Sequence, residues 1–113
     1  MNIHRGHLYI ADLNPPLGTE AGKRRPVVII QSDLLNETGH PSTWVLPCTT
    51  QLSLENILRV RLPKSCAGNA QDCEVMIDQS RAIDNQRLKK HSGEIPGPLF
   101  EEIMDKLKLV AGI

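Results

Sequence analysis

The sequence predicts a mainly β domain of the α+β kind: a small, partly open barrel with short helices and one helix at the C-terminal end. Two observations support this fold class. Short β-branched or alternating segments recur between clusters of turn-forming residues, which is typical of strands in small barrels. The one long helical pattern lies after residue 97. With 113 residues, of which 40% are apolar, we expect a single domain over 1–113 with a modest core.

The expected strands cover residues 8–11, 27–30, 44–49, 57–62 and 74–78, with a short extended piece at 81–84. Residues 27–30 are β-branched throughout, which is typical of a strand buried on both faces. Residues 57–62 alternate instead, with Arg59 and Arg61 on the same face. The pattern therefore predicts a half-exposed strand whose outer face is basic.

Two helices are expected. Ser32 can cap a short helix that ends at Gly39, and Pro98 occupies the favoured first position of the C-terminal helix, which Gly112 ends. The apolar residues of that helix recur at helical spacing: Leu99, Ile103, Leu107 and Val110. Residues 87–98 are polar, and we expect them to form a connection.

The charges balance, because thirteen Lys and Arg stand against thirteen Asp and Glu. This balance excludes a disordered charged tail and a histone-like polycation, and the 3% of aromatic residues argues against a base-stacking RNA-recognition sheet. Taken alone, zero net charge argues against a nucleic-acid partner. However, the basic residues gather at residues 23–25, whereas acidic residues are concentrated over residues 94–106. A local positive groove is therefore compatible with the neutral total.

No apolar run approaches the roughly 20 residues of a membrane span, and the first ten residues do not resemble a signal peptide. Three sparse cysteines suit a reducing compartment, so the expected location is the cytoplasm. The sequence contains no phosphate-binding loop, nucleophile elbow, zinc-protease or dinucleotide motif. Cys66 and Cys73 lack the repeated spacing of a zinc site, which favours ordinary buried or loop cysteines.

Three polar clusters remain as candidates. Residues 22–26 place Arg25 at the mouth of a buried strand, where its guanidinium can address a phosphate, although a solvated loop tip has the same composition. Residues 47–51 place hydroxyl groups and an amide at the end of a strand, where they can bind phosphate oxygens. An ordinary strand-to-turn transition has the same composition. Residues 77–84 hold Asp78 and Arg81, which are spaced so that they can simply clasp a turn.

Together these clusters resemble one family. The strand-entering Arg25-Pro26, the segment PCTT at 47–50 and the segment DQSRAID at 78–84 follow the opening RGHLYIADLNPPLGTEAGKRRPVVI in order. This set resembles the MazF/PemK-type toxins of bacterial toxin–antitoxin modules, over nearly the whole chain from Arg5 to Gly112.

The resemblance implies a homodimeric, SH3-like PemK-type barrel that acts as an endoribonuclease without a metal or another cofactor. Such toxins cut single-stranded RNA at short sequences, with messenger RNA as the expected target, and thereby inhibit translation and growth. They leave 2′,3′-cyclic phosphate and 5′-hydroxyl ends. The implied partner is an antitoxin whose acidic C-terminal tail occupies the RNA groove.

The resemblance also implies site residues. Arg25 corresponds to the arginine that stabilises the phosphorane, Thr49 to the catalytic threonine, and Asp78 to an acidic position that some members use as a base. The high pKa of arginine favours an electrostatic role for Arg25 over proton donation. The expected RNA-binding residues are Thr19, Glu20, Lys23, Arg24, Thr50, Gln51, Gln79 and Arg81.

The chain departs from the pattern of some members, in which a His and an Arg precede the acidic residue. Thr19 and Met76 occupy those positions here. The His/Arg/Asp form of the mechanism is therefore weakened, whereas the Arg25–Thr49 form is intact. The sequence does not identify the general base.

Three alternatives follow from the same residues. Relatives of this fold that poison DNA gyrase end in Trp-Gly-Ile, but this chain ends in Ala-Gly-Ile. A catalytically degenerate toxin would still bind its antitoxin. A peptide-binding module would need an aromatic-lined groove, whereas Tyr9, Trp44 and Phe100 are all expected in core positions.

Overall fold

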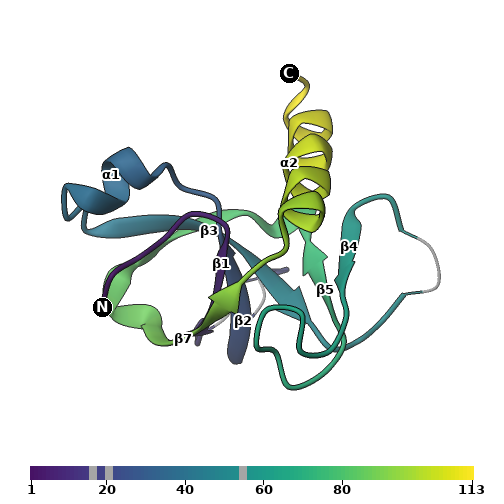
Figure 1. Cartoon of the computed structure of the whole chain (residues 1–113), viewed down its shortest axis with the longest axis horizontal. Coiled ribbons are helices and arrows are strands. Elements are labelled where there is room, and N and C mark those ends of the chain that lie inside the picture. The colour runs from purple at the N-terminus through teal and green to yellow at the C-terminus, as the bar shows by residue number, and fades with distance from the viewer. Residues whose placement is uncertain (16–17, 20–21, 54–55) are drawn as a thin grey trace.

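The protein is described by a computed structural model that covers residues 1–15, 18–19, 22–53 and 56–113. Within these residues the elements are, in chain order, β1 (His7–Asp12), β2 (Arg24–Ile29), α1 (Asp33–Glu37), β3 (Ser42–Thr49), β4 (Arg59–Leu62), β5 (Cys73–Met76), the 3₁₀ turn η1 (Ile77–Gln79), β6 (Arg81–Asp84), the 3₁₀ turn η2 (Asn85–Arg87), β7 (Leu88–Glu94) and α2 (Gly97–Ala111). α2 stands beside β4 and β5 at one end of the molecule (Figure 1).

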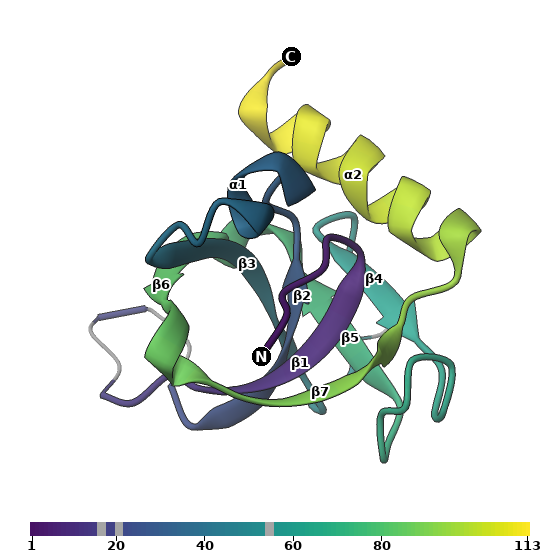
Figure 2. The ribbon, with the colours of Figure 1, turned by 60° about the vertical axis from the view of Figure 1, so that its left-hand side comes forward.

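The strands form one curled antiparallel sheet. Its order is β4-β5-β3-β2-β1-β7, and β6 pairs with β3 beside this path. The described sheet curls round without joining its two ends, β4 and β7, which confirms the predicted partly open barrel (Figure 2).

The core lies on both faces of β2, as its sequence predicts. Val28 packs in the cluster beneath α2, together with Leu46 and Ile103. Val27 and Ile29 belong to a second cluster on the opposite face of the sheet. Because β2 is buried on both faces, its first residues are held on a rigid element, and this rigidity fixes the residues that enter the pocket described below.

The helix boundaries follow the predicted caps. The backbone N–H of Leu34 donates to the Ser32 hydroxyl at 3.2 Å, and Gly112 ends α2 in the left-handed conformation with φ 76°. Among the described residues, no helix is both long and apolar enough to cross a membrane.

Several sequence predictions are wrong in detail. Residues 88–94 form the strand β7, not a connection, because β7 pairs with β1 through its backbone and buries only the Leu88 side chain fully. The predicted strand at 74–78 ends at Met76, before η1 begins at Ile77, and the one at 57–62 begins at Arg59. α2 begins at Gly97, one residue before the predicted first position at Pro98. Trp44 is not a core residue, since 43% of it is exposed.

Candidate active site

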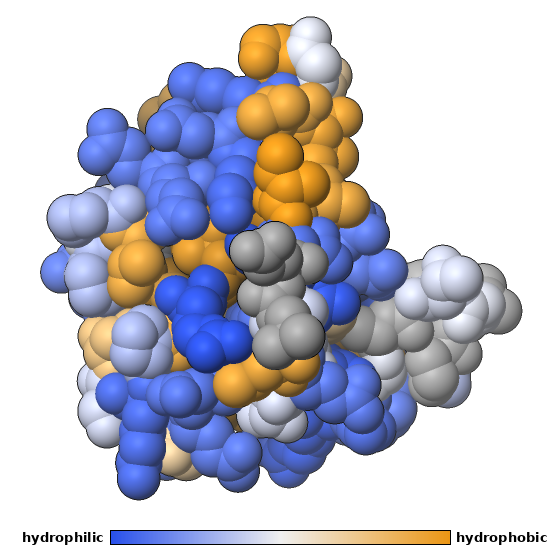
Figure 3. Space-filling view, turned by 90° about the vertical axis from the view of Figure 1, so that its right-hand side faces the viewer, coloured by the Kyte–Doolittle hydropathy of each residue, from blue (hydrophilic) through white to orange (hydrophobic). Residues whose placement is uncertain are grey.

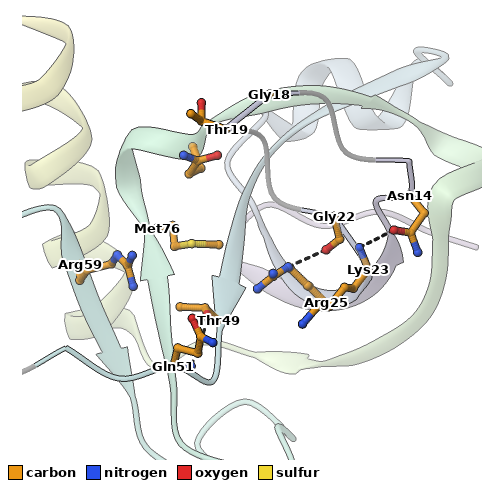
Figure 4. Close-up of a pocket in the computed structure, with 11 residues that line it drawn as sticks. Asn14, Gly18, Thr19, Gly22, Lys23, Arg25, Thr49, Gln51, Arg59 and Met76 are labelled. Atoms are coloured by element: carbon orange, nitrogen blue, oxygen red, sulfur yellow. Dashed lines mark hydrogen bonds between the residues drawn. The ribbon is translucent and has the colours of Figure 1, made fainter.

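A pocket of about 480 Å³ opens where the start of β2, the end of β3 and the strands β4 and β5 meet (Figure 4). The residues that line it are Asn14, Gly18, Thr19, Gly22, Lys23, Arg25, Thr49, Gln51, Arg59, Met76 and Gln79. A second hollow of about 230 Å³ adjoins it and shares Lys23, Arg25, Thr49 and Gln51. We call the wall formed by Lys23, Arg25 and Thr49 the β2–β3 side, and the wall formed by Arg59 and Met76 the β4–β5 side.

Arg25 is half-buried and is held by two backbone carbonyls. Its Nε donates to the Gly22 carbonyl at 2.6 Å and its Nη1 donates to the Cys48 carbonyl at 3.3 Å. Both acceptors are neutral, so they fix the guanidinium without cancelling its charge. Figure 4 shows the group pointing into the pocket. A fixed guanidinium with its charge available is suited to bind an anion such as a phosphate.

The turn before Arg25 is strained and well anchored. Lys23 has a φ of 67°, which is unusual for a residue with a side chain. Its backbone N–H donates to Asn14 Oδ1 at 2.8 Å, and its carbonyl accepts from the N–H of Leu13 at 2.8 Å. These bonds hold the chain in a tight turn, which places the exposed Lys23 side chain at the edge of the pocket.

Thr49 ends β3 and is only 7% exposed. Its Oγ1 accepts a hydrogen bond from the N–H of Gln51 at 3.1 Å, which turns the chain out of the strand. A hydroxyl can accept one hydrogen bond and donate another, so the Thr49 O–H can donate to a ligand while Oγ1 accepts from Gln51. The turn leaves Thr50 and Gln51 exposed on the rim of the adjoining hollow.

The β4–β5 side is organised around a buried carboxylate. Glu74 is 4% exposed and accepts from Arg59 Nη1 at 3.3 Å and from Arg61 Nη2 at 3.4 Å. Burial raises the pKa of Glu74, but hydrogen bonds from Ser53 and Arg61 and the charge of Arg59 outweigh burial, so the pKa lies below its ordinary value. The predicted half-exposed strand with a basic outer face is confirmed, because Val60 and Leu62 are buried whereas Arg59 and Arg61 are partly exposed. The prediction did not include the carboxylate that both arginines bind.

The structure brings most of the predicted site residues together. Arg25, Thr49, Thr19, Lys23, Gln51 and Gln79 line the pocket, and Arg24 and Thr50 line the adjoining hollow. Glu20 lies outside the described residues.

Asp78 and Arg81 are placed differently. Asp78 is exposed on η1, and neither hollow is lined by Asp78 or Arg81. Arg81 begins β6, opposite Val45 of β3. Because β5 gives way to a 3₁₀ turn at Ile77, Gln79 reaches the pocket and Asp78 does not.

Sequence reasoning missed Arg59 as a pocket residue. The alternation of residues 57–62 correctly placed Arg59 on the same strand face as Arg61, but the pairing of β4 with β5 decides that this face lines the pocket. No local signal in the sequence reports that pairing.

Among the described residues, no group of three or more His, Cys, Asp and Glu side chains is arranged to hold a metal ion. The cysteines are free thiols, with Cys48 and Cys73 buried in the core. A hydrogen bond with Cys73, together with burial, raises the pKa of the Cys48 thiol well above its ordinary value.

The chemistry of the pocket is that of an anion site. Its charged lining residues are Lys23, Arg25 and Arg59. Hydroxyl and amide side chains, Met76 and two glycines make up the rest of the described lining, which contains no acidic side chain. Such a set can bind a phosphodiester and stabilise negative charge that develops on its oxygens.

Comparisons with known proteins identify the family of this chain. A sequence model of the PemK-like, MazF-like toxins of type II toxin–antitoxin systems matches residues 4–111. The Endoribonuclease EndoA of Bacillus subtilis is 30% identical over 110 residues, which cover 96% of this chain and 94% of that protein.

Solved structures show the same fold. The crystal structure of MazF from Deinococcus radiodurans superimposes with a TM-score of 0.85 at 24% identity, covering 100% of this chain and 99% of that one. A MazE-MazF crystal structure from the same organism gives a TM-score of 0.80 at 22% identity, covering 100% of this chain and 99% of that one. With the family match over nearly its whole length, the chain belongs to the PemK-like, MazF-like toxins of type II toxin–antitoxin systems.

Proposed function

We propose that this toxin is a sequence-specific endoribonuclease that cuts single-stranded RNA, chiefly messenger RNA, and so inhibits translation and growth. The observation that carries the proposal is the placement of Arg25 and Thr49 in one pocket lined by cations and described without an acidic residue. The name of the related Endoribonuclease EndoA supports the same activity. Because its RNA substrates are in the cytoplasm, we place its action there.

The proposed reaction is an internal transesterification. The 2′-hydroxyl loses its proton and attacks the adjacent phosphorus, the bond to the 5′-oxygen breaks, and that oxygen takes up a proton. The products are a 2′,3′-cyclic phosphate and a 5′-hydroxyl. Negative charge grows on the non-bridging oxygens of the phosphorane, where the fixed Arg25 guanidinium and the Thr49 hydroxyl would donate hydrogen bonds.

Proton transfer requires a base for the 2′-hydroxyl and an acid for the 5′-oxygen. Asp78 is the predicted base, but its exposed position on η1 lies outside the residues lining the pocket. The Asp78→Asn variant described in the Discussion tests this role directly. The reaction is proposed to need no metal, because the family resemblance implies none.

We propose that the other residues of the pocket and of the adjoining hollow bind the nucleotides on either side of the cleaved bond. Lys23 and Arg24 supply positive charge, and Gln51, Gln79 and Thr19 supply hydrogen-bonding groups at different points of the rim. The proposal retains the other predicted RNA-binding residues: Glu20, Thr50 and Arg81. A groove with few cations predicts modest non-specific binding, with a small dependence on salt.

Two partners complete the proposal. A MazE-MazF structure is among those that share this fold, which supports a cognate antitoxin; its acidic tail would compete with RNA for Arg25. We further propose a homodimer. Leu109, Val110 and Ile113 are exposed at the end of α2, where Figure 3 shows apolar surface that a second copy would cover.

The gyrase-poison alternative is not favoured. Relatives with that activity end in Trp-Gly-Ile, whereas Ala111 precedes the final Gly-Ile here, and Arg25 and Thr49 line one pocket.

The test is to incubate the purified protein with a long single-stranded RNA in EDTA and to sequence the fragment ends. We expect cuts at discrete sites with 5′-hydroxyl ends, and none in duplex RNA of the same sequence. Loss of cutting in EDTA would contradict the metal-independent reaction. Absence of cutting under every condition, with the fold intact, would instead favour a degenerate toxin that only binds its antitoxin.

A further inference from the structure

We propose that Arg59 is a second phosphate-binding residue of the pocket and that buried Glu74 is the positioning residue that holds it there. This inference rests on the proposed function. It adds a binding role for Arg59, which lies across the pocket from Arg25 (Figure 4), and a positioning role for Glu74.

Strand register places these residues on one face. Thr49 of β3 lies opposite Glu74 of β5, and Glu74 lies opposite Arg61 of β4. In the next row, Met76 lies opposite Arg59. Side chains that lie opposite or two residues apart share a face of a sheet. The face that carries Thr49 therefore also carries Glu74 and Arg59, while Val60 and Val75 point from the other face into the core.

The carboxylate of Glu74 is held by its surroundings. Its two oxygens accept from the N–H of Ser53 at 3.1 and 3.2 Å, and Oε1 accepts from the Ser53 hydroxyl at 3.0 Å. Ser53 follows the turn after Thr49, so Glu74 ties the segment bearing Gln51 to β5. A buried carboxylate with this many donors is a fixed point against which a flexible side chain can be oriented.

The backbone of Arg59 is anchored as well. Its N–H donates to the Asn56 carbonyl at 3.1 Å, and its carbonyl accepts from Lys106 Nζ of α2 at 2.9 Å. With the backbone fixed and Nη1 bound to Glu74, the guanidinium points into the pocket towards the Arg25 side (Figure 4). A phosphate in this pocket would therefore meet cations from two walls.

The charges leave a surplus for a ligand. Two cations, Arg59 and Arg61, share the single carboxylate of Glu74, which leaves one net positive charge on the cluster. Only Arg59 lines the pocket, with 25% of its side chain exposed; Arg61 has 48% exposed and lines neither hollow. Because both arginines bind the same carboxylate, Arg61 is a matched control for Arg59.

The probe is a single-stranded RNA of about 12 nucleotides around the strongest mapped cut, with a 2′-deoxy nucleotide in place of the one whose hydroxyl attacks. We expect Arg59→Gln to raise the Kd for this RNA about tenfold and to reduce the slope of log Kd against log salt by about 0.7. On cleavable RNA, KM should rise while kcat stays within about twofold. Arg61→Gln should leave Kd and KM within about twofold of wild type, because an exposed ion pair contributes little.

Glu74→Gln tests the positioning role. Alone it should raise Kd about as much as Arg59→Gln, and in the Arg59→Gln background it should have no further effect, as expected for two residues that act through one contact. Thermal unfolding of each variant checks that the fold is retained.

Three results would overturn the inference. One is an equal loss, or no loss, in Arg59→Gln and Arg61→Gln. Another is a double variant that regains wild-type affinity, because Arg59 would then only mask the charge of Glu74. The third is a fall in kcat with KM unchanged. If the wild type neither cuts nor binds RNA, the proposed function fails, and this inference fails with it; the first three results leave the proposed function standing.

Discussion

The two walls of the pocket fix their arginines by opposite means. On the β2–β3 side, Arg25 is held by the neutral carbonyls of Gly22 and Cys48. On the β4–β5 side, Arg59 is held by the buried carboxylate of Glu74, which it shares with Arg61. Carbonyls position a guanidinium and leave its charge intact, whereas a carboxylate positions it and offsets much of its charge.

This difference separates two tasks. The full charge of Arg25 is suited to stabilise the extra negative charge that appears only in the phosphorane, while the partly offset Arg59 suits the constant charge of a bound phosphate. It is also compatible with the proposed RNA binding by a chain with thirteen basic and thirteen acidic residues. The carboxylate that holds Arg59, Glu74, is buried among its hydrogen-bond donors and does not line the pocket.

The largest effect should come from Arg25→Ala. We expect the cleavage rate to fall about 100- to 1,000-fold. Among the described residues that line the β2–β3 side, Lys23 would be the one cation left. The matched control is Arg24→Ala, which removes the exposed neighbouring cation and should cost less than about tenfold through weaker RNA binding. Initial cleavage rates measure both, and an equal loss in the two variants would contradict the assignment of Arg25.

Thr49→Val is expected to have the next largest effect. It keeps the shape of the side chain but removes the hydroxyl, which accepts from the N–H of Gln51 and would donate to the phosphate. We expect a loss of about 10- to 100-fold in kcat/KM, as for a hydrogen bond to a charged group. Thr50→Val is the comparison variant; it changes an exposed hydroxyl that water can replace, so its effect should be about threefold or less.

Glu74 should make stability depend on pH. Its pKa is lowered in the folded protein, so its contribution is present above the unfolded pKa and is lost as the pH falls through the folded pKa. Urea unfolding should show the wild type losing stability below about pH 5. Glu74→Gln should be about 1–3 kcal/mol less stable at pH 7 and show a flatter curve at low pH. If the free energy of unfolding depended on pH in the same way in the wild type and in Glu74→Gln, the donors would not stabilise the ionised carboxylate of Glu74.

Asp78→Asn should have the smallest effect. A general base must come within hydrogen-bonding reach of the proton it removes, and exposed Asp78 is not among the residues lining the pocket. From the structure we expect the cleavage rate at pH 7 to change by less than about threefold. A loss of about 100-fold, with RNA binding unchanged, would instead support the base role that the family resemblance implies.

Local features were predictable from the sequence. The fully β-branched run at residues 27–30 predicted a strand buried on both faces, and Ser32 and Gly112 predicted the caps that are observed. These features depend on residues close together in the chain. Arg25 and Thr49 were candidates because one lies near the start and the other at the end of a patterned strand, and the family resemblance then implied their roles.

Features that depend on pairing between distant strands were not predictable. β7 lacks an apolar pattern because it joins the sheet through its backbone on β1. The Arg59–Glu74 contact depends on the register of β4 and β5, and the outward position of Asp78 depends on the 3₁₀ turn that ends β5. Alternation places a side chain on a face, but it does not say what that face contacts.

The most direct test of the division between the two walls is single-turnover cleavage of one RNA over a range of enzyme concentrations. The account predicts that Arg25→Ala lowers the maximal rate at saturating enzyme about 100-fold or more, whereas Arg59→Gln raises the half-saturating concentration and leaves the maximal rate nearly unchanged. A wild-type maximal rate in Arg25→Ala, or a loss of maximal rate in Arg59→Gln as large as that in Arg25→Ala, would contradict it.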